Sequence, residues 1–325
     1  MRAAWYEKTG PASKVLVVGE LPDPTPGPGE VLVRVRYSGV NPGDAKKREG
    51  WQGGPMPYPR VIPHSDASGV IDAVGAGVDA ARVGRRVWVH GAQSYRPFGT
   101  AAEYVVVPGD LAVDLPDGVP DTLGACLGIP GITAHRAVFA DGPVDGLTVL
   151  VQGVHGAVGR LAAQLARRAG ARVIGTIRKR QDFLDVESGT ADHVVVLGSE
   201  ARERIAKLAP DGVHRIIEVA FAANLKLDAA VAAPGATIAA YGTDDPKPRL
   251  PFWPMLFDNL VIRLLGSDDF PVEAKRAAAA DLTAAASEGA LPTPIRKPLR
   301  LARIAKAHDL VEGGIRARVL IDPTA

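Results

Sequence analysis

Cysteine and a surplus of one charge sign are both nearly absent from this chain of 325 residues. The single cysteine, Cys126, has no partner for an intramolecular disulfide, and it excludes a metal site built from several cysteines. Lys and Arg number 38 and Asp and Glu 36, a formal net charge of +2, so the composition shows no basic footprint for nucleic acid. We therefore expect no nucleic-acid partner.

Long apolar runs are missing as well. No stretch approaches the roughly 18 residues that a membrane-spanning helix needs, and the first residues, MRAAWYEKTG, meet charge too early for a secretory signal. Hydrophobic residues make up 46% of the chain, which excludes a disordered protein. We expect a soluble cytoplasmic protein without a membrane partner, long enough for two domains.

Two kinds of pattern divide the chain. The first part is β-rich, with short apolar runs between Pro and Gly clusters at 15–21, 31–40, 67–75, 86–91 and 103–108. From residue 148, strands alternate with helices, which predicts a parallel doubly wound sheet. After Ser267 an Ala-rich helix (273–288) and a last strand break this alternation, so we expect the tail to return to the first domain. The predicted domains are 1–122 with 267–325, and 123–266.

The most specific motif is VLVQGVHGAVG, residues 149–159, in which an apolar run meets spaced glycines and a helix pattern follows. This order is typical of a dinucleotide fingerprint. Gly153 would permit the turn, Gly156 would let the backbone approach a pyrophosphate, and Gly159 would let the helix pack on the sheet. The alternative is a purely structural turn. The turn residues predicted to bind a cofactor are Gly153, His155, Gly156, Ala157, Val158 and Gly159.

The second strand of this region, ARVIGTI, ends without the acid that binds the ribose hydroxyls of NAD. It continues instead into Arg178, Lys179 and Arg180, whose charged groups can pair with a 2′-phosphate. The sequence therefore predicts NADPH as the cofactor, in preference to NADH, with Arg316 and Arg318 as further candidate anchors. The alternative is a solvated basic loop.

Seven segments occur in an order that resembles one known family along the whole chain: 39–44, 62–78, 98–108, 128–138, 149–159, 216–220 and 305–314. The chain resembles the zinc-independent branch of the medium-chain dehydrogenase/reductase superfamily, specifically the zeta-crystallin-like quinone oxidoreductases. The resemblance implies an α/β fold with a GroES-like β-rich catalytic domain, a Rossmann doubly wound domain and an NADPH-dependent two-electron reduction.

The resemblance also implies residues of the reaction site. Thr133 matches a position that contacts the nicotinamide end, and Asn41 and Asp44 match a loop that lines the site. Asn and Asp are equally typical of a capped turn before a helix, so that alternative stays open. Ala220 and Gly242 are expected on the cofactor side, Gly242 because ligands collect at the carboxyl ends of parallel strands, although an ordinary turn glycine is the alternative.

A general acid is harder to identify. His64, Tyr58 and Lys46 are candidates, and for His64 the alternative is a surface histidine without a function. An aromatic wall for a planar substrate is a further possibility, although local packing is the more common use of such residues: Trp51, Tyr95, Phe252, Trp253 and Phe270.

The zinc-dependent relatives have ligands that this chain lacks. Asn41 stands where they have a cysteine, and the position of the ligand histidine falls on Ser65. Cys126 lies upstream of the third ligand position, near Ile129, and a short loop (91–99) replaces the structural zinc lobe. We expect no zinc.

These features predict hydride transfer from NADPH to a small-molecule quinone or related α,β-unsaturated carbonyl, for which positioning and water exclusion can suffice. The alternatives are an enoyl-thioester or alkenal reductase on the same scaffold and a non-enzymatic, crystallin-like binding protein. The apolar run 259–266 is expected at a sheet edge and predicts a homodimer. Burial of that run beneath helix 273–288 is the alternative.

Overall fold

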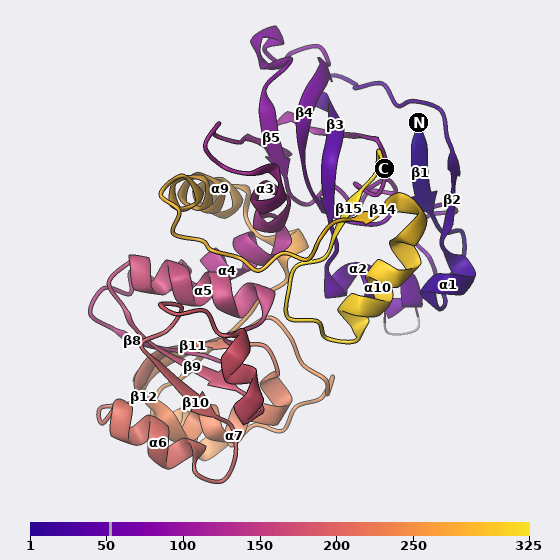
Figure 1. The fold of residues 1–325 in the computed structure, drawn as a ribbon. Coiled ribbons are helices and arrows are strands. Elements are labelled where there is room, and N and C mark those ends of the chain that lie inside the picture. The colour runs from indigo at the N-terminus through magenta and orange to yellow at the C-terminus, as the bar shows by residue number, and fades with distance from the viewer. Residues whose placement is uncertain (52–53) are drawn as a thin grey trace. The chain divides into compact units, whose positions relative to one another are not determined.

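The computed structural model describes residues 1–51 and 54–325, which form two units with separate sheets and cores (Figure 1). Unit 1 consists of Met1–Pro130, Ala286–Glu288 and Pro292–Ala325. Unit 2 consists of Gly131–Ala285 and Gly289–Leu291. Each unit is described by itself below.

Unit 1 is built on a seven-stranded sheet in which all neighbours except β14 and β15 pair antiparallel. Along its longest strand Val31, Val33 and Val35 alternate with more exposed residues and enter one apolar cluster, as expected for a half-buried strand. A two-stranded sheet of β1 (Arg2–Trp5) and β2 (Val17–Glu20) completes the unit. The strands of the large sheet are β3 (Glu30–Gly39), β4 (Asp66–Val74), β5 (Arg86–Val89), β6 (Tyr104–Pro108), β7 (Ala112–Asp114), β14 (Leu299–Arg300) and β15 (Leu320–Asp322).

The helices of unit 1 lie at two places on this sheet. Helix α3 (Asp121–Leu127) packs on β3, β4 and β5, whereas α10 (Ile304–Glu312) packs on α1 (Ala12–Val15) and α2 (Pro42–Glu49) (Figure 1). Ile304, Ala307 and His308 are the buried face of α10, at the spacing that one side of a helix requires. Short 3₁₀ turns occur at Ala80–Arg82, Gly109–Leu111 and Leu301–Arg303.

Unit 2 contains a six-stranded, wholly parallel sheet in the order β10-β9-β8-β11-β12-β13. The strand order reverses direction between β8 and β11, where doubly wound folds bind ligands at the carboxyl edge. All four residues of β8 are buried, as expected for a central parallel strand covered on both faces. The strands are β8 (Thr148–Val151), β9 (Arg172–Ile177), β10 (His193–Val196), β11 (Val213–Glu218), β12 (Ala232–Ala240) and β13 (Val261–Leu264).

Helices cover both faces of this sheet. Figure 1 shows α5 on one side and α6 and α7 on the other, where they enclose an apolar core with β8 to β12. The helices are α4 (Ile129–Phe139), α5 (Ala157–Arg168), α6 (Ala201–Leu208), α7 (Phe221–Val231), α8 (Phe252–Phe257) and α9 (Val272–Ser287). Two 3₁₀ segments, Arg180–Asp185 and Ser267–Asp269, complete the unit.

The fold class follows the prediction, but the division of the chain differs from the predicted boundaries at 122/123 and 266/267. Helix α9 belongs mainly to unit 2 because Leu282 packs on Gly131, where an added Cβ would lie only 2.9 Å from the leucine. Asp281 of α9 also pairs with Arg168 of α5 at 2.7 Å. Only the segment after α9, with β14, α10 and β15, returns to the sheet of unit 1.

Candidate functional site

The glycine turn of unit 2 has the geometry that the motif predicts. Gly153 follows β8 with φ +69°, a conformation that favours glycine, and Gly156 donates its N–H to the Gly153 carbonyl (2.9 Å). Gly156 is the N-cap of α5. An added Cβ at Gly159 would collide with the Gly153 carbonyl, so α5 can approach the turn only with glycine there. Contact of Gly153, Gly156, Ala157, Val158 and Gly159 with a phosphate stays a prediction.

A series of hydrogen-bonded, buried side chains connects this turn to β9 and α7. The Gly153 N–H donates to Thr176 Oγ1 of β9 (3.2 Å), and the Thr176 hydroxyl donates to Gln152 Oε1 (2.6 Å). Gln152 Nε2 then donates to Asp228 Oδ1 of α7 (2.7 Å). The sequence analysis missed these residues, although a glutamine that ends an apolar strand was a usable signal.

The carboxyl end of β11 carries a second acid, Glu218, which is fully buried. It accepts hydrogen bonds from the Ala220 N–H and from Asn224 Nδ2 (3.1 Å). The nearby Gly242 carbonyl accepts the Phe221 N–H (3.0 Å), and an added Cβ at Gly242 would lie 2.5 Å from the Val219 carbonyl. Ala220 and Gly242 therefore have structural roles, and their contact with a cofactor stays a prediction.

The basic loop after β9 is exposed at Arg178, Lys179 and Arg180. Asp182 accepts the Lys179 backbone N–H (3.1 Å) and lies 3.6 Å from His155 Nε2 of the glycine turn. The turn and the basic loop are thus connected through a His155–Asp182 pair in which both side chains are buried.

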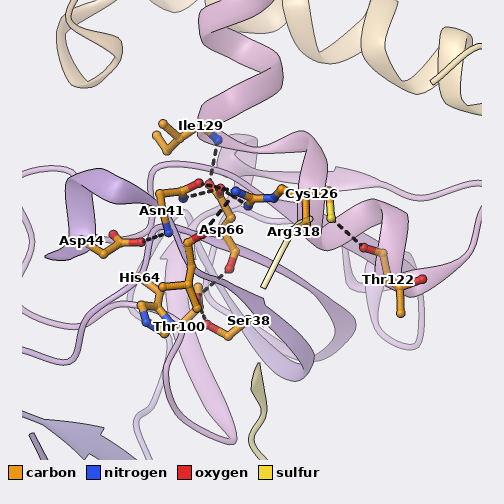
Figure 2. A network of polar contacts seen from close by, with 11 residues as sticks. Ser38, Asn41, Asp44, His64, Asp66, Thr100, Thr122, Cys126, Ile129 and Arg318 are labelled. Carbon is orange, nitrogen blue, oxygen red and sulfur yellow. Dashed lines mark hydrogen bonds and ion pairs between the residues drawn. The ribbon is translucent and has the colours of Figure 1, made fainter. Parts of the chain in front are cut away.

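Unit 1 has its own buried polar centre around Asp66 (Figure 2). This carboxylate accepts from Asn41 Nδ2 (2.6 Å) and from the Ile129 N–H (2.7 Å), and it lies 3.7 Å from Arg318 NH2. Arg318 NH1 donates to Asn41 Oδ1 (2.9 Å) and to the Val40 carbonyl (3.2 Å). A guanidinium therefore balances the charge of the Asp66 carboxylate inside this unit.

This geometry gives Arg318 a role inside unit 1. Its side chain is only 6% exposed and contacts Asn41 and Asp66, and its contact with a 2′-phosphate stays a prediction. Arg316 is half-buried two residues before it. Cys126, next to the same centre, donates its Sγ–H to the Thr122 carbonyl (3.1 Å), and burial raises the pKa of the Cys126 thiol.

Asn41 and Asp44 occupy the capped turn that their residue types allow. Asn41 is the N-cap of α2, and its backbone N–H donates to Asp44 Oδ2 (2.7 Å). Burial, together with the charge of Asp66, raises the pKa of Asp44 to about 7. Asn41 additionally connects α2 to Asp66 and Arg318, so its side chain does more than cap a helix.

His64 is not a surface histidine but a fully buried one, with φ +77°. Its Nδ1 lies 2.8 Å from Ser38 Oγ, and its Nε2 lies 3.0 Å from Nε2 of His308 (Figure 2 shows the Ser38 side). Burial lowers the pKa of His64 well below its usual value, with His308 and Arg318 adding to the effect. A neutral, deeply buried imidazole is a poor proton donor at neutral pH, and a role of His64 in the reaction stays a prediction.

The remaining candidates make local contacts. Thr133 is buried on α4. Tyr58 donates to the Tyr95 carbonyl (2.5 Å), and Lys46 Nζ lies 5.5 Å from the centre of the Trp51 ring. Of the other aromatic residues, Phe252 and Trp253 pack edge to face on α8 and are exposed, whereas Phe270 is buried.

Metal-binding and membrane features were sought over the same residues, 1–51 and 54–325. Within these ranges, no group of three or more His, Cys, Asp or Glu side chains is arranged to hold a metal ion. None of the helices formed by these residues has the length and apolar character needed to cross a bilayer.

Known proteins resemble this chain in sequence and in structure. The alcohol dehydrogenase GroES-like domain family matches residues 27–117, and the zinc-binding dehydrogenase family matches residues 157–278. Human quinone oxidoreductase is 30% identical over 320 residues, covering 97% of this chain and 94% of the relative.

Two solved structures extend the likeness. A mycobacterial protein in complex with NADPH has a TM-score of 0.84 and 26% identity, covering 99% of this chain and 100% of that chain. An NAD-dependent alcohol dehydrogenase has a TM-score of 0.87 and 26% identity, covering 99% of both chains.

Proposed function

The chain belongs to the medium-chain dehydrogenase/reductase family, among the relatives of the quinone oxidoreductases, and is an oxidoreductase; we propose that it transfers a hydride from NADPH to a quinone or related α,β-unsaturated carbonyl. The observation that carries the proposal is the glycine turn between β8 and α5, at the carboxyl edge of a doubly wound sheet. The full-length similarity to quinone oxidoreductases supports the class of acceptor.

The residues of unit 2 fit a dinucleotide. The positive φ of Gly153 and the absence of a Cβ at Gly159 bring the N-terminus of α5 against the turn, where free N–H groups and the helix dipole favour a pyrophosphate. The exposed Arg178 and Lys179 supply positive charge beyond β9. NADPH would supply the hydride, and the protein would bind and orient it.

Cofactor preference rests on this chain's own residues, because one similar structure contains NADPH and another is that of an NAD-dependent enzyme. Unit 2 has no acid at the end of β9, and three basic residues follow it. The nearest acid, Asp182, is buried and turned toward His155 and the Lys179 N–H. This arrangement favours the 2′-phosphate of NADPH.

The proposal includes Thr133 at the nicotinamide end and Asn41 and Asp44 on the substrate side. It also includes a reaction without metal, because a quinone or enone is electrophilic enough for positioning and water exclusion to supply much of the rate. Finally, we propose a homodimer, in which a second copy covers the edge strand β13.

The test is NADPH oxidation by the purified protein with quinones, enones and enoyl thioesters as acceptors. The highest kcat/KM is expected for a quinone or enone, whereas a thioester preference would point to an enoyl-thioester reductase. A protein that binds NADPH but oxidises it with none of these acceptors would contradict the proposal.

A matched pair of glycine variants tests the turn. Gly153 and Gly146 have nearly the same φ, +69° and +71°, so Gly153→Ala and Gly146→Ala introduce similar backbone strain. Only the Gly153 variant alters the turn, and it alone should raise the KM for NADPH. An equal KM in both variants would remove the turn from the cofactor site.

A further inference from the structure

Beneath the glycine turn, two acidic side chains that the proposed reaction does not use lie buried side by side. The carboxyl groups of Asp228 (α7) and Glu218 (β11) lie close enough to interact electrostatically, and neither side chain has any exposed surface. Two ionised carboxylates buried side by side would repel each other, so such a pair favours a state in which only one of them is charged. One of the two therefore holds a proton.

The donors around the pair identify which one. Glu218 accepts hydrogen bonds from the Ala220 N–H and, at both of its carboxylate oxygens, from Asn224 Nδ2 (3.1 and 3.2 Å). These hydrogen bonds favour the charged form of Glu218. Asp228 accepts at Oδ1 from Gln152 alone. Asp228 is therefore the member of the pair that holds the proton.

The pair is connected to the turn by bonds with a determined direction. The Thr176 hydroxyl has one proton and gives it to Gln152 Oε1, so Thr176 is left to accept the Gly153 N–H. Because the Gln152 oxygen accepts from Thr176, its amide nitrogen faces Asp228 as a donor. The orientation of the Gly153 amide thus depends on Asp228 remaining an acceptor at Oδ1.

We propose that Asp228 is a positioning residue for the cofactor: as the protonated member of the pair with Glu218, it holds Gln152 and Thr176 in the orientation that aligns the Gly153 turn. This inference rests on the proposed binding of NADPH at that turn. Asp228 itself touches no substrate or cofactor; it acts through two intermediate side chains.

Electrostatics agrees with this geometry. Burial raises the pKa of Asp228 well above its usual value, and the charge of Glu218 raises it further, whereas Gln152 opposes the shift. On the β12 side the titratable group facing Glu218 is Tyr241, which is half-buried. Helices α6 and α8, which also pack on α7, contribute apolar residues such as Ile205 and Met255 to the surrounding core.

The protonation carries a defined pH dependence. A carboxyl whose pKa is raised in the folded state stabilises the fold fully below its unfolded pKa, and that stability is lost as the pH rises through the folded pKa. In this enzyme the ionisation of Asp228 would place two negative charges next to each other. Their repulsion would disturb the hydrogen bonds that hold the Gly153 turn. NADPH affinity should therefore weaken at alkaline pH.

The test compares Asp228→Asn with Asp228→Ala by measuring the Kd for NADPH across a range of pH. Asn keeps the acceptor at Oδ1 and replaces the carboxyl proton with an N–H donor, but it cannot ionise. Asp228→Asn should bind NADPH as the wild type does at acidic pH, and the wild-type Kd should rise relative to that of the variant as pH increases. Asp228→Ala should raise the Kd about tenfold, with little change in kcat.

Two further variants keep the test decisive. Thr176→Val removes the hydroxyl that accepts the Gly153 N–H, nearly without changing shape, and should also raise the Kd. Val231→Ala creates a cavity at the buried end of the same helix, so it should lower the thermal midpoint and leave the Kd unchanged.

The outcomes separate the two levels of the inference. A wild-type protein that does not bind NADPH contradicts the proposed function itself. Normal NADPH binding in the wild type, with a Kd in Thr176→Val and Asp228→Ala equal to that of the wild type, overturns the positioning role alone. If the ratio of the wild-type Kd to the Asp228→Asn Kd is the same at every pH, the assignment of the proton to Asp228 is wrong.

Discussion

Single buried polar residues are satisfied in this protein by partners far away in the sequence, and His64 illustrates how. The Thr100 hydroxyl donates to the Asp66 carbonyl (2.7 Å), so the Ser38 hydroxyl must supply the proton of its bond with Thr100 (2.7 Å). His64 Nδ1–H then donates to Ser38, and His64 Nε2 accepts from His308 Nε2–H. The contacts thereby assign the tautomer of both histidines.

Acid should weaken unit 1 through these histidines. Burial lowers the pKa of His308 to about 3, and the charge of Arg48 adds to this. A histidine with a depressed pKa contributes stability that is complete above its unfolded pKa, about 6.5, and that falls by up to about 1.4 kcal/mol per pH unit below it. The unfolding free energy should therefore drop between about pH 7 and pH 5.

Tryptophan fluorescence during urea unfolding suits this measurement, because Trp5, Trp51 and Trp88 lie in unit 1 and only Trp253 lies in unit 2. His308→Gln should flatten the dependence on pH. His193→Gln, which removes an exposed histidine, should leave it unchanged. An equal slope in all three proteins would show that the buried pair does not titrate as expected.

The basic residues after β9 give a second prediction at this scale. If one charged contact contributes about 1.5–3 kcal/mol, NADPH should be preferred over NADH by about tenfold to a hundredfold. Arg178→Ala with Lys179→Ala should reduce this preference through the cofactor KM, since the 2′-phosphate is remote from the hydride. Arg202→Ala with Lys207→Ala removes the same charge from exposed positions of α6 and serves as the control.

Equal kcat/KM for NADH and NADPH in the wild type would contradict the preference. A preference that survives in the Arg178 and Lys179 double variant would point to Arg180, Arg316 or Arg318 as the anchor.

At the scale of elements, the N-terminus of α2 shows how a local signal acquires a tertiary role. Pro42 at the first helical position and the Asn41 N–H···Asp44 contact are a local start signal for a helix. The Asn41 side chain, however, lies between Asp66 of β4 and Arg318 beside β15. The start of α2 is thus attached to two strands of the sheet.

Asn41→Ala should therefore lower the free energy of unfolding by more than the loss of a helix cap alone would. A cap alone contributes about 0.5–2 kcal/mol, and leaving buried polar partners unsatisfied adds about 1–3 kcal/mol. Asp79→Ala is a matched control, because the Asp79 side chain only caps an exposed 3₁₀ turn by accepting the Ala81 N–H (2.9 Å). Denaturant unfolding of both variants measures the difference, and equal losses would mean that Asn41 is only a cap.

At the scale of the whole molecule, the edge strand β13 determines the expected assembly. It pairs with β12 on one side, and Leu264 at its end is 73% exposed, so α9 does not bury it. Exposed aromatic residues of the preceding helix α8, Trp253 and Phe257, add to the apolar surface. An uncovered edge with this composition favours pairing with a second copy.

If the wild type forms the proposed dimer, Leu264→Lys should shift it toward monomers, because the symmetric contact would then bury two unpaired charges. Light scattering at micromolar concentration measures the mass. Leu184→Lys places the same charge on an exposed leucine elsewhere in unit 2 and should leave the dimer intact. A wild-type protein that is already monomeric would contradict the prediction.

Metal independence is the other prediction for the whole enzyme. A chelator should leave NADPH oxidation unchanged, and metal analysis should find less than one zinc per chain. The reason is that the candidate ligands have other partners. Asn41 and Asp66 contact the Arg318 guanidinium, and the Cys126 thiol is hydrogen-bonded to the Thr122 carbonyl. Stoichiometric zinc together with loss of activity on chelation would contradict it.

The sequence by itself determined the features that local chemistry dictates. The glycine spacing at 153–159 requires a turn between strand and helix, and the alternation after residue 148 requires a parallel sheet, because both depend on neighbours along the chain. The Ala-rich helix was predicted within one residue of its bounds, Val272–Ser287. Its assignment to unit 2 was not, since it depends on Leu282 meeting Gly131.

Only the tertiary structure decided what the polar residues do. His64 and His308 are separated by 244 positions, and Arg318 and Asn41 by 277, so no periodicity or spacing could pair them. Asp228 looks like an ordinary polar position of a helix until folding places it against Glu218. A buried polar group must find its partner in space, and that partner is chosen by the packing of whole elements rather than by the chain near it.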